Sequence, residues 1–139
     1  MARAHWLVKS EPSTYSWDDL VRDGRTRWDG VRNPLARQHL EAMRAGDLVL
    51  FYHSNVGKDV VGIARVVRQS YPDPADPRWL AVDLEPLRAI AAPVALATIK
   101  ADAKLADLAL VRQSRLSVMP VAAAHFARLL KLGRTRAPR

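Results

Sequence analysis

The ten residues Trp28-Asp29-Gly30-Val31-Arg32-Asn33-Pro34-Leu35-Ala36-Arg37 place an aromatic ring, a tight turn, two arginines and an asparagine side by side. Gly30 permits the positive φ that an Asp-Gly turn favours. Asn33 followed by Pro34 predicts a helix N-cap with proline at the first helical position. Because a helix N-terminus favours anions and hydrogen-bond acceptors, the stretch combines the groups that hold a flat, polar, partly anionic ligand. A nucleobase with its phosphate fits that description.

A purely structural role for the same stretch is the competing interpretation. Trp28 would then belong to the hydrophobic core, Asp29-Gly30 would form an ordinary turn, and Asn33 would serve only as a helix cap. The density of hydrogen-bonding residues beside the tryptophan, where a plain loop would suffice, favours binding.

Length and composition indicate one globular domain. The chain has 139 residues, of which 49% are apolar, enough to bury a single hydrophobic core. It has no cysteine, which excludes disulfides and thiolate metal sites. No apolar run approaches the ~18 residues of a membrane span, and the N-terminus lacks the apolar segment of a signal peptide. We therefore expect a soluble monomer in the cytoplasm, associated with the nucleoid if the source is bacterial.

The chain is strongly basic. Its formal net charge is +8, and residues 101–139 hold eight lysines and arginines against two aspartates. Such a domain attracts polyanions through counterion release, whatever their sequence. Nucleic acid is favoured over a membrane surface because no basic amphipathic segment carries a matching aromatic face.

Hydrophobic periodicity, capping residues and prolines predict alternating strands and helices. Residues 48–52 form an unbroken apolar run, as in a strand buried on both faces, whereas residues 80–85 alternate as in a half-exposed strand. The elements expected up to residue 87 are a strand over 5–9, a helix capped by Ser16 and closed by Gly24, a helix over 34–44 with Leu35, Leu40 and Met43 inside and Gly46 as C-cap, strands over 47–54 and 60–69, a loop over 71–78, and a strand over 79–87.

The remainder of the chain is rich in alanine. Residues 91–110 predict one or two helical pieces, and residues 115–119 predict a short strand or extended link. Pro120 then begins a last helix with an inner face of Ala122, Phe126, Leu129, Leu130 and Gly133. The whole pattern predicts an α+β fold, a small mixed or antiparallel barrel decorated by short helices. We assign residues 1–133 to one domain and residues 134–139 to a flexible basic tail.

Catalysis has little support in the sequence. The four histidines, His5, His39, His53 and His125, are isolated and lack metal-ligand spacing. His53 and Ser54 are adjacent on a predicted strand, so their side chains point to opposite faces. We therefore expect no catalytic residue, no metal and no cofactor.

Polar residues at strand ends are more informative. Lys9 and Ser10 leave the first strand, Tyr52-His53-Ser54 leave the central strand, and Arg115-Leu116-Ser117 precede the last helix. Each has an ordinary structural explanation when it is considered alone. Together with Trp28 and Asn33 they would line one mouth of a small barrel, which is how such barrels hold a ligand.

Six motifs follow one another over essentially the whole chain, from Trp6 to about Leu132. They are Trp6-Leu-Val-Lys-Ser-Glu-Pro12, Tyr15-Ser-Trp-Asp-Asp-Leu20, Trp28-Asp-Gly-Val-Arg-Asn33, Gly46-Asp47, Tyr52-His-Ser54 and Ser114-Arg-Leu-Ser-Val-Met-Pro-Val121. In this order they resemble the EVE-domain family.

The resemblance implies a PUA-like pseudobarrel of five to six strands, related to YTH and SRA domains. It also implies a binding module for a modified base in DNA, such as methylated or hydroxymethylated cytosine, held flipped or unpaired in an aromatic pocket. Carried over motif by motif, the pocket would comprise Lys9, Ser10, Trp28, Val31, Asn33, Tyr52, His53, Ser54, Leu116 and Ser117, with Arg32, Arg37 and Arg115 on the phosphates.

Three alternatives stay open at this point. The module could bind modified bases in RNA, although DNA is favoured. An enzyme acting on a modified nucleotide would need a general base, for which His53 or Glu11 is the candidate. A pocket that senses a small metabolite, or a protein-binding module, is the third.

Overall fold

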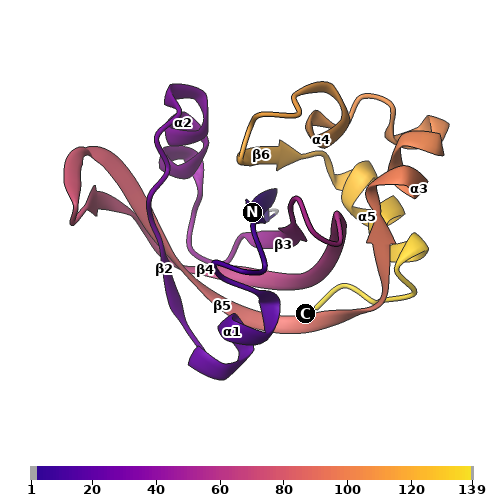
Figure 1. Ribbon diagram of the computed structural model, residues 1–139, viewed down its shortest axis with the longest axis horizontal. Helices are drawn as coiled ribbons and strands as arrows, with labels where there is room; N and C mark the ends of the chain where they lie inside the picture. Colours follow the sequence, from indigo (N-terminus) through magenta and orange to yellow (C-terminus); the bar gives the residue numbers. More distant parts are fainter. Residues whose placement is uncertain (1–2, 139) are drawn as a thin grey trace.

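A computed structural model describes residues 3–138 as a curled sheet of six strands with short helices around it (Figure 1). The strand order is β2-β5-β4-β3-β1-β6; β1 and β3 are parallel, and the other neighbours are antiparallel. The predicted α+β, PUA-like mixed sheet is confirmed, but the sheet is open between its edge strands β2 and β6, so it only approximates a barrel. The strands are β1 (His5–Ser10), β2 (Thr26–Trp28), β3 (Leu48–His53), β4 (Asp59–Asp73), β5 (Asp76–Ala95) and β6 (Val118–Val121).

Capping residues define the two N-terminal helices. In α1 (Trp17–Asp23), the Ser16 hydroxyl accepts from the Asp19 amide, the Asp19 carboxylate accepts from the Ser16 amide, and Gly24 ends the helix at φ +74°. In α2 (Pro34–Ala42), the Asn33 side chain accepts from the Ala36 amide at 3.0 Å. These capping predictions are confirmed.

The predicted end of α2 is wrong. Met43 caps the helix in extended conformation, and Gly46 belongs instead to the turn before β3. Leu40 and Met43 are buried as expected, whereas Leu35 is 40% exposed.

The long β4–β5 hairpin corrects two predictions. Residues 71–78 are not a loop, because β4 continues to Asp73 and β5 begins at Asp76. Irregular register between β4 and β5 accommodates the prolines that lack an N–H for the ladder. Residues 91–95 are strand, not helix, because Val60 pairs with Val94 and long-range pairing overrides the helix preference of alanine. The helical pieces of this region begin later, as α3 (Leu96–Ala101), η1 (Ala103–Leu105) and α4 (Ala109–Arg112).

Pro120 does not begin the last helix. It pairs with Trp6 in the edge strand β6, where a missing N–H leaves no neighbour unsatisfied. The helix α5 (Ala123–Leu132) buries Phe126, Leu129 and Leu130 as expected, but Ala122 precedes it and is exposed.

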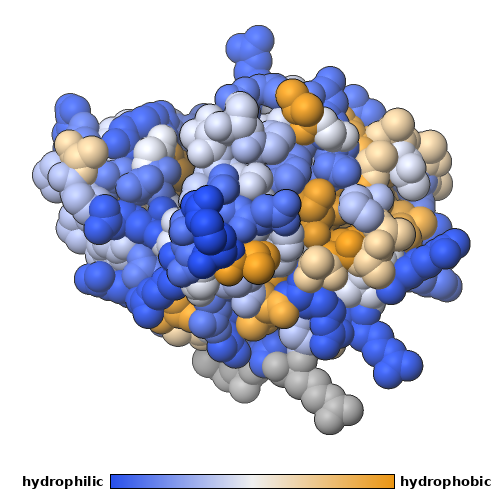
Figure 2. All heavy atoms as spheres, turned by 60° about the horizontal axis from the view of Figure 1, so that its bottom comes forward, coloured by the Kyte–Doolittle hydropathy of each residue, from blue (hydrophilic) through white to orange (hydrophobic). Residues whose placement is uncertain are grey.

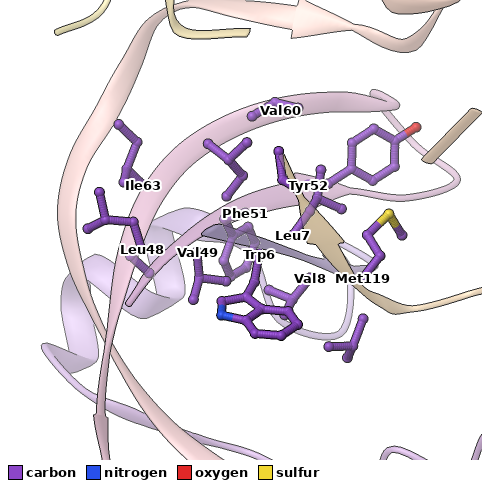
Figure 3. Close-up of a cluster of buried hydrophobic side chains, with 14 of the residues drawn as sticks. Trp6, Leu7, Val8, Leu48, Val49, Phe51, Tyr52, Val60, Ile63 and Met119 are labelled. Atoms are coloured by element: carbon purple, nitrogen blue, oxygen red, sulfur yellow. The ribbon is translucent and has the colours of Figure 1, made fainter. Parts of the chain in front are cut away.

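The core lies along β1, β3 and β4, and Figure 3 shows side chains of β1 and β3 packed with Met119 of β6. One buried carboxylate connects this core to the loop after α2. Asp47 accepts hydrogen bonds from the Trp6 indole at 3.0 Å and from the Ala4 and Arg44 amides. The Gly46-Asp47 motif therefore holds the start of β3 to the first strand.

The predicted flexible tail, residues 134–139, is partly fixed to the sheet. The Thr135 hydroxyl accepts from the Ala91 amide at 2.9 Å, and the Arg136 carbonyl accepts from the Arg88 guanidinium at 2.9 Å. Figure 1 shows this segment beside β5. Residues 1, 2 and 139 of the predicted domain and tail lie outside the described residues.

Most of the face shown in Figure 2 is hydrophilic, with apolar side chains in separate patches. The large apolar side chains that are most exposed, those of Val21, Leu35 and Val56, come from three different segments. Within residues 3–138, every helix is too short or too polar to cross a membrane.

Candidate functional site

A cavity of about 550 Å³ lies where the curled sheet fails to close. One side comes from the end of β1 and the loop after it, the other from β2 and the turn that follows, and Ser117 closes it just before β6. Its volume is within the range of small-ligand sites. The lining residues are Lys9, Ser10, Glu11, Thr14, Tyr15, Thr26, Arg27, Trp28, Asp29, Gly30, Val31, Arg32 and Ser117.

Trp28 belongs to both the core and the cavity. Its ring packs edge-on against Phe51 at 5.5 Å and is only 9% exposed. It nevertheless borders the cavity, where Tyr15 lies at 6.5 Å with its ring turned by 79°. The structural and binding interpretations of Trp28 are therefore compatible, because one edge of the indole packs inward while the residue still lines the cavity.

The turn after Trp28 is held by a buried carboxylate that the sequence analysis did not identify. Asp73, at the end of β4, accepts from the Gly30 amide at 3.0 Å and from the Arg32 guanidinium at 2.9 Å through Oδ2, and from the Ala75 amide at 2.8 Å through Oδ1. Its side chain is 1% exposed. The bond from the Gly30 amide is the largest cause that lowers the pKa of Asp73. Asp73 thus keeps this wall of the cavity in place.

Two of the three predicted phosphate-binding arginines are engaged within the protein. Arg32 pairs with Asp73, donates to the Val31 carbonyl and lies over the Trp79 ring at 5.8 Å. Arg37 donates to the Arg78 carbonyl at 3.0 Å and lies 3.7 Å from Glu41.

Arg115 differs from these two arginines. It is exposed, borders a separate depression, and makes no hydrogen bond or ion pair within the part of the chain that the structure describes. Of the three arginines, it is the one whose guanidinium is free for a phosphate.

Lys9 and Ser10 enter the cavity from the end of β1, as expected. The Ser10 hydroxyl donates to the Tyr15 carbonyl at 2.6 Å, which fixes the loop that carries Tyr15. The Lys9 ammonium donates to the Ser114 carbonyl at 2.8 Å, and burial lowers its pKa. These two contacts connect the end of β1 to the loop that carries Tyr15 and to the segment that begins at Ser114.

Of the predicted pocket residues, Lys9, Ser10, Trp28, Val31 and Ser117 line the cavity together. Asn33 and Leu116 border the depression of Arg115 instead. Tyr52 and Ser54 border a third depression, and His53 lines none of these three. The α2 N-terminus consequently lies outside the cavity, because the chain turns away from it after Arg32.

Sequence reasoning missed Tyr15 and Asp73 as parts of the site. Tyr15 stood within a recognised motif, and an aromatic residue in a loop beside a strand end was an available signal. Asp73 gave no local signal, because it lies 43 residues from Gly30 and meets it only through the hairpin.

The two candidate general bases already have hydrogen-bond partners. The His53 Nε2 atom accepts from the Trp17 amide at 3.0 Å, which occupies the lone pair that a general base would use. The Glu11 carboxylate accepts from the Asn55 side chain. Within residues 3–138, no three His, Asp or Glu side chains come together as a metal site.

Comparison with known proteins confirms the resemblance. The EVE domain model matches residues 4–132. Human thymocyte nuclear protein 1 is 30% identical over 93% of this chain and 73% of its own length. A solved structure from Rhodopseudomonas palustris is 48% identical, with a TM-score of 0.91 over 94% of this chain and 93% of that chain.

A further similar structure contains a ligand. Human THYN1 in complex with 5-methylcytosine-containing DNA is 29% identical, with a TM-score of 0.88 over 96% of this chain and 99% of that chain. With the family model matching almost the whole chain and the fold in common, the protein described here belongs to the EVE-domain family.

Proposed function

We propose that this protein is a non-catalytic module that binds modified cytosine in DNA and holds the flipped or unpaired base in the cavity beside Trp28. The observation that carries the proposal is this cavity, which combines two aromatic residues with hydroxyl-bearing side chains at the open seam of the sheet. The complex of the related human protein with methylcytosine DNA supports DNA as the polymer.

The roles of the cavity residues follow from their chemistry. The base stacks on an aromatic ring of Tyr15 or Trp28, an interaction worth about 1–3 kcal/mol per base. Ser117 offers a hydroxyl to the polar edge of the base. The Ser10 hydroxyl, which donates to the Tyr15 carbonyl, offers its oxygen as an acceptor, and Val31 offers an apolar surface to a methyl group. Because contact with one methyl group contributes only about 1–3 kcal/mol, discrimination between methylated and plain cytosine is modest.

We expect unpaired DNA to be the preferred ligand. Extruding a base from a duplex costs a few kcal/mol, and less at a mismatch. This one small domain has no obvious means to offset that cost on fully paired DNA. We therefore expect affinity to rise from duplex to mismatched to single-stranded oligonucleotides.

The test is a binding series at stated salt with DNA oligonucleotides that contain cytosine or 5-methylcytosine. Trp28→Ala removes core packing as well as a stacking surface, so Tyr15→Leu is the cleaner variant. Tyr71→Leu is its matched control, since Tyr71 likewise donates its hydroxyl to an aspartate but lies outside the cavity.

Tyr15→Leu should weaken methylcytosine binding about 5- to 150-fold, the equivalent of one lost stacking contact, while Tyr71→Leu leaves it unchanged. Equal affinities of Tyr15→Leu and the parent protein would contradict the stacking role. Preference for methylated RNA would move the function to RNA, and binding of the free nucleoside as tightly as the oligonucleotide would indicate a metabolite sensor.

A further inference from the structure

The depression bordered by Tyr52 and Ser54 is a cavity of about 190 Å³. It adjoins the cavity beside Trp28, which we call the base cavity, and Lys9 lines both. We call the smaller cavity the lysine cavity, after Lys9, Lys58 and Lys100. The hydroxyl-bearing residues Tyr52, Ser54 and Ser114, together with Asn55, complete its polar lining. Three ammonium groups and three hydroxyls offer many hydrogen-bond donors, which is the chemistry that a phosphate group requires.

The charged residues that line this cavity are all positive. None of its lining residues is acidic. Within residues 3–138, Lys9, Lys58 and Lys100 form no ion pair, whereas Arg32, Arg37 and Arg112 each have an acidic partner. Lys9 donates to a neutral carbonyl, so its charge is not cancelled by that contact.

Two acidic residues lie nearby without lining the cavity. Asp59 follows Lys58, and its negative charge adds to burial in raising the pKa of Tyr52. The Glu11 carboxylate accepts from the side chain of Asn55, a lining residue. Two carboxylates against three lysines still leave a net positive charge. Figure 3 shows the Tyr52 hydroxyl directed away from the other labelled core side chains, at the edge of the cluster.

The loop that carries Lys58 is held in an unusual conformation. Asn55 and Lys58 have φ of 62° and 49°, a region that residues other than glycine rarely adopt. Backbone bonds fix both ends of the loop, because the Ser54 amide donates to the Ser10 carbonyl and the Lys58 carbonyl accepts from the Leu96 amide. Lys58 is therefore presented by a restrained backbone between β1 and α3.

We propose that the lysine cavity binds the phosphate of the nucleotide whose base occupies the adjacent cavity. This inference rests on the proposed function and adds the site for the backbone. It also assigns phosphate binding near the base to lysines, in place of Arg32 and Arg37, whose guanidinium groups are occupied within the protein.

The experiment compares 5-methyl-2′-deoxycytidine with its 5′- and 3′-monophosphates in titrations of the parent protein. One monophosphate should bind at least about tenfold more tightly than the nucleoside, as expected for charge-assisted hydrogen bonds. Lys58→Gln and Lys100→Gln should remove that gain and leave nucleoside affinity unchanged. Lys131→Gln, an exposed lysine that lines neither cavity, is the matched control and should retain the gain.

If the monophosphates bind no more tightly than the nucleoside, or if Lys131→Gln removes the gain in affinity equally, the phosphate role of the lysine cavity is refuted. The proposal for the base cavity is not affected by either result. Failure of the nucleoside and both monophosphates to bind would count against the proposed function itself. In that case, titration with inorganic phosphate, monitored by amide chemical shifts, tests phosphate binding in the lysine cavity separately. Shifts confined to Ser54, Lys58 and Ser114 would support it, and scattered or absent shifts would refute it.

Discussion

Replacing Asp73 by asparagine tests whether this carboxylate holds the cavity wall. Three donors divide between its two oxygens: the Gly30 amide and the Arg32 guanidinium on Oδ2, and the Ala75 amide on Oδ1. An asparagine of the same shape has only one acceptor oxygen. In either orientation of the amide, its NH₂ group faces at least one of these donors.

The expected loss of stability follows from these contacts. A hydrogen bond to a charged group contributes about 1.5–3 kcal/mol, and a buried donor left unpaired costs about 1–3 kcal/mol. Arg32 is 39% exposed and can regain water, which limits the loss. We expect Asp73→Asn to lower the free energy of unfolding by about 2–4 kcal/mol.

Urea denaturation of the parent protein and the variant measures this difference. Asp76→Asn is the matched control from the same hairpin, since Asp76 pairs with the exposed Arg78, and it should change the midpoint little. Asp73→Asn should also weaken binding of methylcytosine DNA, because the Gly30–Arg32 wall loses its anchor. Equal midpoints for the two variants would refute the role given to Asp73.

Three further predictions use other contacts. The hydrogen bonds that Asp73 accepts lower the pKa of its carboxyl group. The stabilisation by ionised Asp73 is therefore complete above the usual aspartate pKa of about 3.9 and is lost as the pH falls through the lowered pKa. Between pH 5 and pH 3, the urea midpoint should fall less for Asp73→Asn than for the parent protein. Gly62→Ala places a Cβ into the Trp17 ring and should cost at least about 2 kcal/mol by overpacking, seen as a lower Tm; an unchanged Tm would contradict the close approach. Arg115→Ala should weaken binding to all DNA sequences and reduce the salt dependence by about one phosphate contact, whereas a loss limited to one base would contradict a phosphate role.

Local interactions explain which parts of the fold were predictable. The Ser16 and Asn33 caps and the left-handed Gly24 depend on hydrogen bonds or steric limits within four residues. The buried strand β3 was evident from its unbroken apolar run. The family motifs, which place Trp28 and Val31 in one site, were likewise visible without coordinates.

Long-range pairing decided what these local signals left unsettled. Pro120 lies in a strand because β1 pairs with it at the sheet edge, and the alanine-rich end of β5 is extended because β4 pairs with it. Pairing of β2 with β5 likewise positions Trp28, which lines one cavity with Tyr15, whereas Asn33 borders a separate depression.

The sequence by itself determined the α+β class, the helix caps and the polar turn that follows Trp28. Only the tertiary structure decided that Asp73 anchors this turn and that Lys9, Lys58 and Lys100 share one cavity. The physical reason is separation along the chain. These groups lie tens of residues apart, and the pairing of the strands must bring them together before their charges and hydrogen bonds can interact.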